Sequence, residues 1–316
     1  MELNEKDYAP VFIPTLCRYE HFKRCVDSLS RCIGANNTTL IIGLDFPLKM
    51  EHWEGYQKIK AYIPAISGLK KIDVIERTEN YGALKNVVEA QKYIFERYET
   101  CIYSEDDNEF SLNFLEYINK GLVIYKDNTK VMSVCGYMYP FNLHIQRGNS
   151  FLGTAFCAWG VGEWREKRLN IDKPEALSIV DGILHSWKKS LKILRKSPKE
   201  INSLIIMKTR GIVWGDVLIT STCILEGKGS VFPVISKVRN WGDDGSGLHC
   251  KDGNRYSQQD IDTNASFDYD IEIDRMVNFT PHKLSMLIKI TIFLRYLIFR
   301  LTNKDILAFH YKNRKV

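Results

Sequence analysis

The stretch Cys101-Ile102-Tyr103-Ser104-Glu105-Asp106-Asp107 places three adjacent acids directly after a short apolar run. The run has the length and residue types of a buried strand. Adjacent carboxylates repel one another unless a cation or hydrogen-bond donors offset their charge. Hard divalent ions that also bind phosphate use one or two such carboxylates. The stretch therefore predicts a metal and phosphate site at the end of a strand, and the alternative interpretation is a solvated acidic turn.

Strands and helices alternate on both sides of this run. Apolar β-rich runs cover residues 11 to 14, 39 to 44, 72 to 75 and 131 to 134, and apolar residues at helical spacing cover 22 to 33, 84 to 98 and 112 to 122. Apolar strands that are each followed by a helix predict an α/β fold with a mainly parallel sheet and helices on both faces. Ligands bind at the carboxyl ends of such strands, where Asp45 and the acidic triplet both lie.

The second half of the chain is less regular. An amphipathic helical stripe runs from Ala176 to Leu194, and residues 284 to 301 are strongly apolar but contain Lys289, Arg295 and Arg300. Three basic charges in this length argue against a membrane-spanning helix. Two interpretations of the C-terminal stretch stay open: a helix lying on a membrane surface, and an ordinary packed helix.

The charge of the chain is concentrated at its C-terminus. The 316 residues carry a net charge of +6, and from Arg275 onward nine Lys or Arg residues face one acid, Asp305. A basic and apolar end favours contact with a membrane through residues 284 to 316 over nucleic-acid binding, which we exclude. No signal-peptide core follows a basic start, so we expect a cytoplasmic protein, free or peripheral at the inner face of the membrane.

Three more segments follow predicted strands or precede predicted helices. Thr15 and Arg18 lie between the first strand and the first helix, where backbone N–H groups and a guanidinium can hold phosphate. Asp45 can accept hydrogen bonds from a ribose hydroxyl or a base N–H. Asn80 and Gly82 precede a helix whose first turn contains Lys85. Read alone, each of these segments is as easily a turn, a helix cap or a surface residue.

Trp214-Gly215-Asp216 stands before a further predicted helix. A carboxylate flanked by tryptophan and apolar residues can have a raised pKa and act as a general base. The alternative is a helix-capping aspartate, and the residues by themselves favour the cap.

In this order along the chain, the segments resemble the GT-A glycosyltransferases, most closely the N-acetylglucosaminyltransferase I type, and bacterial enzymes that build surface polysaccharides. The resemblance rests on Tyr103-Ser104-Glu105-Asp106-Asp107 with Phe114-Leu115-Glu116-Tyr117, and more weakly on the Trp159 to Trp164 segment and Ser236-Lys237-Val238-Arg239-Asn240-Trp241-Gly242. It covers roughly residues 9 to 250. The eukaryotic family has an N-terminal membrane anchor that this sequence lacks, so a bacterial enzyme of lipopolysaccharide or capsule synthesis suits it better.

The resemblance implies a role for each motif. Asp107 would bind Mn²⁺ or Mg²⁺, and Asp216 would deprotonate the acceptor. The nucleotide-sugar would contact Thr15, Arg18, Asp45, Asn80, Gly82, Lys85, Glu105 and Asp106, and the donor and acceptor pocket would include Trp159, Glu163 and Trp214. The reaction would move a sugar, such as N-acetylglucosamine, from a UDP-sugar to a hydroxyl of a saccharide or lipid-linked saccharide, with inversion.

We expect three regions: a nucleotide-sugar-binding α/β half over residues 1 to 135, an acceptor-binding and catalytic half over 136 to 260, and a basic apolar extension over 261 to 316. Two other functions are considered. A nucleotidyltransferase acting on a sugar phosphate needs a glycine-rich basic loop after the first strand, and Pro14-Thr15-Leu16-Cys17-Arg18 has no glycine. The other is a non-catalytic saccharide-binding protein of the same fold.

Overall fold

The fold is taken from a computed structural model, which describes residues 1–140, 148–169, 171–245, 256–270, 276–277 and 284–305. By packing, the chain divides into two compact units, which are described separately. Unit 1 contains Met1–Leu152, Cys157–Arg168 and Val231–Arg275, and unit 2 contains Gly153–Phe156, Leu169–Ser230 and Met276–Val316. The functional division expected at residues 135 and 260 stays a prediction.

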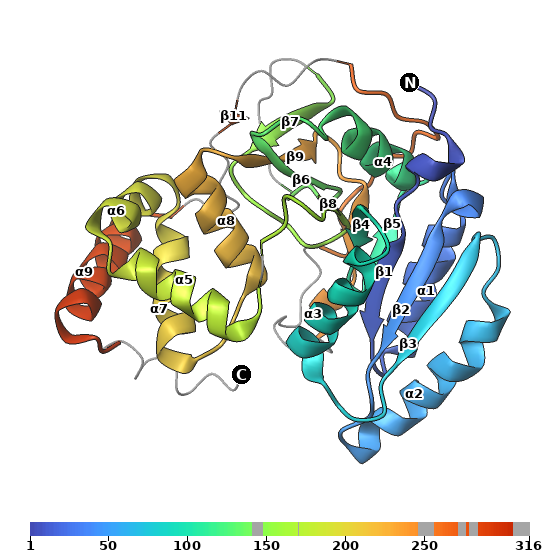
Figure 1. Ribbon diagram of the computed structural model, residues 1–316, viewed down its shortest axis with the longest axis horizontal. Coiled ribbons are helices and arrows are strands. Elements are labelled where there is room, and N and C mark those ends of the chain that lie inside the picture. Colours follow the sequence, from blue (N-terminus) through green and yellow to red (C-terminus); the bar gives the residue numbers. More distant parts are fainter. Residues whose placement is uncertain (141–147, 170, 246–255, 271–275, 278–283, 306–316) are drawn as a thin grey trace. The chain divides into compact units, whose positions relative to one another are not determined.

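Four parallel strands form the first part of the sheet in unit 1 (Figure 1). They are β1 (Val11–Thr15), β2 (Thr39–Leu44), β3 (Lys71–Glu76) and β4 (Thr100–Tyr103). Val11 pairs with Leu40 on one side and with Ile102 on the other, which gives the order β3-β2-β1-β4. The chain winds outward from β1 to β3 and then returns to the other side of β1. The strand order therefore reverses between β1 and β4, and this is where open α/β sheets bind their ligands.

Helices connect these strands and cover both faces of the sheet. They are α1 (Tyr19–Ser30), α2 (Met50–Tyr62), α3 (Gly82–Phe95) and α4 (Phe114–Ile124). Ala90, Ile94 and Phe95 of α3 pack against Phe12 and Ile41 on one face, while α1 and α2 contact each other. Right-handed crossovers place α1 and α2 together and α3 on the opposite face, as Figure 1 shows.

The sheet continues beyond β4 with mixed directions. β8 (Val161–Trp164) runs antiparallel to both β4 and β6 (Val131–Cys135), and β9 (Gly229–Pro233) and β7 (Ser150–Gly153) follow. A separate ribbon pairs β5 (Asn108–Phe110) with β10 (Val238–Asn240). Short 3-10 helices cover Glu5–Asp7, Ala35–Asn37, Ile63–Ala65 and Gly242–Asp244. The expected α/β class, with parallel strands and helices on both faces of the sheet, is confirmed.

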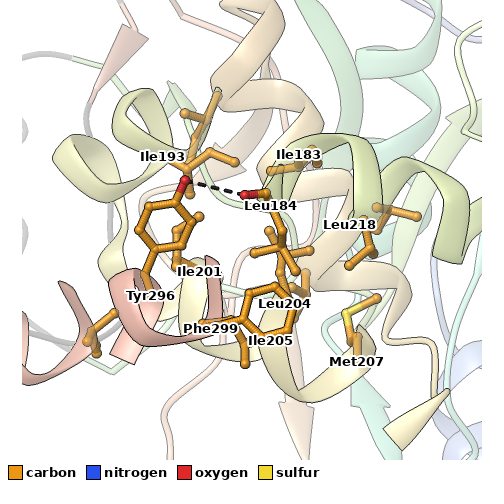
Figure 2. Packing of buried hydrophobic residues seen from close by; sticks show 14 of the residues in the cluster. Ile183, Leu184, Ile193, Ile201, Leu204, Ile205, Met207, Leu218, Tyr296 and Phe299 are labelled. Atoms are coloured by element: carbon orange, nitrogen blue, oxygen red, sulfur yellow. Dashed lines mark hydrogen bonds between the residues drawn. The ribbon is translucent and has the colours of Figure 1, made fainter. Parts of the chain in front are cut away.

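Unit 2 is mainly helical. It contains α5 (Lys173–Leu184), α6 (Trp187–Lys196), α7 (Pro198–Arg210), α8 (Gly215–Glu226), α9 (Met286–Thr302) and the short strand β11 (Met276–Val277). Buried aliphatic and aromatic side chains from all five helices form its core, part of which Figure 2 shows. The Tyr296 hydroxyl in α9 donates to the backbone carbonyl of Leu184, 3.3 Å away.

The C-terminal helix α9 is packed in unit 2, and its contact with a membrane surface stays a prediction. Ile292, Tyr296 and Phe299 of α9 are buried in the core of unit 2, so the helix is packed. Arg295 is also buried and pairs with Asp305, with 2.9 Å between its Nε and the Oδ1 of the acid. No helix within the described ranges is long and apolar enough to cross a membrane. Residues 306–316 of the expected membrane-contacting end lie outside the described part.

Candidate active site

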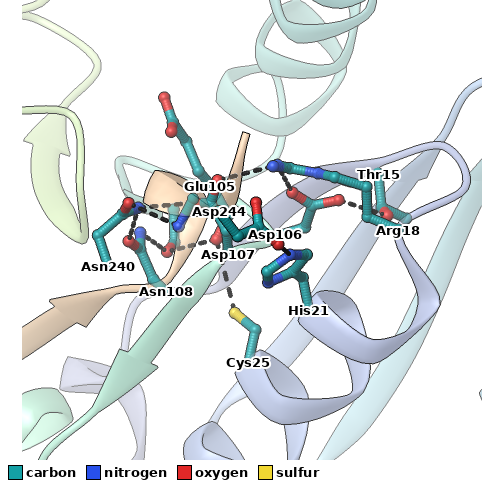
Figure 3. A network of polar contacts seen from close by, with 12 residues as sticks. Thr15, Arg18, His21, Cys25, Glu105, Asp106, Asp107, Asn108, Asn240 and Asp244 are labelled. Atoms are coloured by element: carbon teal, nitrogen blue, oxygen red, sulfur yellow. Dashed lines mark hydrogen bonds and ion pairs between the residues drawn. The ribbon is translucent and has the colours of Figure 1, made fainter. Parts of the chain in front are cut away.

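The acidic triplet lies in a tight connection between β4 and β5, at the point where the strand order reverses (Figure 3). Asp106 and Asp107 form the turn, and each is only 5% exposed. A solvated acidic turn would leave both carboxylates in water. Their burial instead means that nearby groups must balance two negative charges.

Arg18 supplies the balancing charge from the end of β1. Its Nη2 donates to Asp106, and its Nη1 lies 2.9 Å from Oδ2 of Asp107. The Thr15 hydroxyl donates to Asp106 at 2.9 Å. Burial alone would lower the pKa of Arg18, but the charges of Asp106 and Asp107 outweigh it and raise the pKa. Burial raises the pKa of Asp106, against the opposing effect of Arg18. The structure thus joins three of the predicted site residues into one charge cluster with Asp107.

Glu105 is oriented differently from its two neighbours. Its Oε2 accepts a hydrogen bond from the indole Nε1 of Trp159 at 3.1 Å, and its carboxyl points away from the Arg18–Asp106 pair (Figure 3). Burial and the charge of Asp107 raise the pKa of Glu105 to about 8. Glu105 is therefore protonated more readily than an exposed glutamate, which favours hydrogen bonding over holding a metal ion.

The β5–β10 ribbon brings a segment from far along the chain against Asp107. The Asn240 amide donates to Oδ1 of Asp107 at 2.7 Å, and the backbone N–H of Trp241 donates to the Asp107 carbonyl at 2.8 Å. A Cβ on Gly242 would lie 2.4 Å from Oδ2 of Asp107. Only glycine leaves room there for the carboxylate. Asn240 and Gly242 were absent from the predicted site, although their segment carried part of the resemblance.

A second contact of this segment lies next to the acidic turn. Asp244, in the 3-10 helix that follows β10, accepts at 2.8 Å from Nε2 of His21 in α1. Trp241 donates from its indole to Glu109 at 2.9 Å, and the Arg24 guanidinium lies 4.3 Å from its ring centroid. These contacts hold the segment after β10 against α1 and β5, and so fix the glycine beside Asp107.

Asp45 has a structural task in this arrangement. It follows β2 as predicted and is 5% exposed, and its Oδ1 accepts from the backbone N–H groups of Phe46 and Tyr81. Its Oδ2 accepts from the N–H of Gly82 at 2.9 Å and from the Asn80 amide at 3.4 Å. Asp45 thereby satisfies the free donors at the start of α3. Its predicted contact with ribose or base stays a prediction, and it would have to replace some of these bonds.

The predicted residues around α3 sit close to Asp45. The Asn80 amide also donates to the carbonyl of Phe46 at 2.6 Å, and Gly82 takes a positive φ of 69° with open space at its α-carbon. Lys85 places its Nζ 3.7 Å from the ring centroid of Tyr81 and 3.8 Å from Glu79. No described ion pair links Lys85 with the Arg18 cluster, so this part of the predicted site stays a prediction.

Glu163 lies on β8 and pairs in register with Cys101 of β4. Burial raises its pKa, and the charge of Arg168 acts in the opposite direction. Trp159 packs edge-on against Tyr137, with 4.6 Å between ring centroids, and links this aromatic group to Glu105. Trp159 thus contacts the acidic turn, and the place of Glu163 in the pocket stays a prediction.

The remaining predicted residues belong to unit 2. Trp214 is the N-cap residue of α8, and Asp216 is exposed in the first turn of that helix. Asp216 is therefore neither the cap nor a buried carboxylate. Glu200 of α7, which the sequence interpretation missed, is 7% exposed; burial raises its pKa to about 7, and the charge of Asp216 adds to the shift. The Ser197 hydroxyl donates to Glu200 at 3.1 Å, as in a helix-capping pair. In the sequence, Glu200 therefore looks like a capping residue and not like a catalytic one.

The arrangement can hold an anionic ligand together with a cation. Within the described ranges no three His, Cys, Asp or Glu side chains converge as a ready metal site. Two carboxylates beside a guanidinium do provide hard oxygen donors, and the absence of a side chain at Gly242 lets the Asp107 carboxylate keep its position there. A diphosphate could supply further oxygen ligands and could also pair with Arg18.

Comparisons with known proteins give only distant likenesses. No family model and no curated protein matches the sequence. The chain is similar to S. aureus TarS 1-349 at 10% identity and a TM-score of 0.34, over 49% of this chain and 46% of that chain. It is also similar to S. aureus TarS 1-349 in complex with UDP-GlcNAc, at 13% identity and a TM-score of 0.29, over 46% of this chain and 33% of that chain.

A further similar structure is the mannosyltransferase PcManGT from Pyrobaculum calidifontis in complex with GDP-Man and Mn²⁺. It shares 10% identity at a TM-score of 0.41, over 69% of each chain. The alignment spans less than half of the two TarS 1-349 chains. At these identities and TM-scores the likenesses do not bear on the activity or the ligands of this chain.

Proposed function

We propose that the chain is a metal-dependent inverting glycosyltransferase. It would move a sugar from a UDP-sugar, with UDP-N-acetylglucosamine as the first donor to test, to a hydroxyl of a saccharide or lipid-linked saccharide of the cell surface. The observation that carries the proposal is the buried pair Asp106–Asp107, held by Arg18 and Thr15 at the point where the strand order reverses. Open α/β sheets bind nucleotides at that place.

Each residue of the cluster has a proposed role toward the donor. Asp107 would ligate a divalent cation, and the Arg18 guanidinium would also pair with the diphosphate. A bound Mn²⁺ or Mg²⁺ would offset the charge that develops on the leaving diphosphate. Gly242 supports this proposal because only a residue without a side chain lets the Asp107 carboxylate keep this position.

The acceptor half of the reaction is proposed for residues 136 to 260. Asp216 would take the proton of the acceptor hydroxyl while the hydroxyl oxygen forms a bond to the anomeric carbon and the bond to the nucleotide breaks. Attack from the face opposite the leaving UDP inverts the configuration. The exposure of Asp216 supports this role, because an acceptor must reach the base. Glu163 and Asp243 are the next candidates for the base.

A donor screen tests the proposal. The protein is incubated with UDP-, GDP- and dTDP-sugars in Mn²⁺ or EDTA, and release of nucleoside diphosphate is measured. We expect Mn²⁺-dependent hydrolysis of a UDP-sugar that Asp107→Asn abolishes. Release of pyrophosphate from a nucleoside triphosphate and a sugar phosphate would instead indicate the nucleotidyltransferase. Saccharide binding without metal-dependent UDP binding would indicate the non-catalytic protein.

A further inference from the structure

Helix α9 is apolar on two opposite sides. Ile292, Tyr296 and Phe299 face the core of unit 2, while Leu287 and Leu301 are 77% and 85% exposed. At 100° per residue, five of the eight exposed large apolar side chains of α9 lie on the side of the helix opposite the buried ones. These five are Leu287, Ile290, Leu294, Ile298 and Leu301, and the other three are Met286, Ile288 and Phe293. A helix on the surface of a globular protein normally carries polar residues there, so this face indicates an apolar binding partner.

Helix α6 adjoins α9 and is basic where it faces solvent. Trp187 at its start stacks on Tyr296 of α9, with 5.6 Å between ring centroids, and the Arg300 guanidinium lies 5.2 Å from the Trp187 ring centroid. Neither helix contains an acidic residue, and the exposed charged side chains of α6 are Lys188, Lys189, Lys192, Arg195 and Lys196. The contact of Trp187 with Tyr296 thus brings the start of the basic helix α6 to the apolar helix α9.

We infer that the exposed faces of α6 and α9 together bind an anionic lipid bilayer. The apolar face of α9 would enter the boundary between headgroups and acyl chains, and the lysines of α6 would contact the lipid phosphates. Trp187 at the start of α6 is 45% exposed, and tryptophan rings suit the headgroup level. Charge complementarity identifies the partner, because a second copy of the chain would bring two basic α6 faces together.

This inference is independent of the proposed enzymatic function, because vesicle binding needs neither donor nor metal. Both charges and apolar contacts contribute, and each can be removed separately. Loss of one lysine near an anionic surface weakens binding about fivefold, so three would weaken it roughly a hundredfold. Loss of three exposed leucines would weaken it by at least about tenfold, since each buries only part of its side chain.

Co-sedimentation with vesicles tests the surface. The full chain is mixed with phosphatidylcholine vesicles that contain no anionic lipid or about one-third phosphatidylglycerol. We compare Leu287→Gln/Leu294→Gln/Leu301→Gln and Lys188→Gln/Lys189→Gln/Lys196→Gln with matched changes on unit 1. The controls are Ile33→Gln/Val74→Gln/Leu112→Gln, which are 42% to 45% exposed, and Lys58→Gln/Lys126→Gln/Lys130→Gln.

The expected result is binding to anionic vesicles that weakens with salt, falls in both surface variants and persists in both controls. The inference is overturned if the wild type does not sediment with anionic vesicles, or if the leucine variant sediments with them as much as the wild type does. Light scattering that shows a dimer dissociated by the leucine changes, without vesicle binding, would also overturn it and would assign α9 to a subunit interface.

Discussion

The close approach of Gly242 to the Asp107 carboxylate can be tested with a single methyl group. Gly242→Ala would place a Cβ 2.4 Å from Oδ2 of Asp107, 3.0 Å from its Cγ and 3.2 Å from Oδ1 of Asn240. The backbone of Gly242 has no positive φ, so alanine itself is allowed there. The carboxylate must therefore shift by roughly 1 Å, and a misplacement of that size costs about a hundredfold in rate. Crowding of this kind typically also costs about 1–3 kcal/mol of stability.

The assay compares Mn²⁺-dependent hydrolysis of the UDP-sugar with thermal unfolding for Gly242→Ala, Gly182→Ala and the wild type. Gly182 is the matched control, because it lies inside α5, has open space around its α-carbon and needs no positive φ. Alanine there should raise stability by up to about 1 kcal/mol and leave hydrolysis unchanged. Hydrolysis in Gly242→Ala within about threefold of the wild type would refute the assigned position of the Asp107 carboxylate.

Three further outcomes are expected. Folding raises the pKa of the Glu105 carboxyl to about 8, so the folded protein loses stability as the pH increases from the unfolded-state pKa to about 8. In EDTA, Glu105→Gln should therefore stabilise the fold by up to a few kcal/mol above pH 8 and little near pH 4. A constant difference in unfolding temperature across this pH range would contradict the buried state of Glu105. Arg18→Gln removes the cation that both aspartates hold, so Mn²⁺ binding without nucleotide, measured by electron paramagnetic resonance, should tighten by about tenfold while UDP binding weakens; unchanged Mn²⁺ affinity would count against competition between the guanidinium and the metal. Asp216→Asn should keep UDP binding and lose at least about a hundredfold in transfer to an acceptor; full transfer would move the base to another residue.

The parallel sheet was predictable because each of its early strands is apolar along its length. The runs at residues 11 to 14 and 39 to 44 correspond to β1 and β2 almost residue for residue. The stripe from Ala176 to Leu194, in contrast, is two helices. The chain ends α5 at Leu184 and restarts after Ser186, whose hydroxyl accepts from the N–H of Lys189 at 3.4 Å. Apolar spacing continues across such a break, so only the capping serine signals it.

The candidate site was partly predictable for a related reason. Thr15, Arg18, Asp106 and Asp107 lie at strand ends, and parallel strands bring their carboxyl ends to one edge. Asn240 and Gly242 could not be placed, because they reach Asp107 through the pairing of β5 with β10, and Asn108–Phe110 is too short to give a strand pattern. Likewise, Asp45 and Gly82 were read as separate features, whereas the fold joins them in one helix cap.

The basic face of α6 shows another limit of sequence reasoning. Charge counted along the chain pointed to the C-terminal segment, because nine basic residues there face one acid. The five basic residues of α6 did not stand out in this count, because the net charge of the chain before Arg275 is close to zero. Folding places them beside α9 through the stacking of Trp187 on Tyr296. Such a surface depends on a contact between residues far apart in sequence.

We propose above all that Asp107 and a divalent cation hold a nucleoside diphosphate at the end of β4. Isothermal titration of UDP into the wild type and Asp107→Asn, each with Mn²⁺ and with EDTA, tests this most directly. We expect binding heat only for the wild type with Mn²⁺, with both proteins equally folded by circular dichroism. UDP binding that is indifferent to Mn²⁺ and to the substitution, or no UDP binding by the wild type, would contradict it.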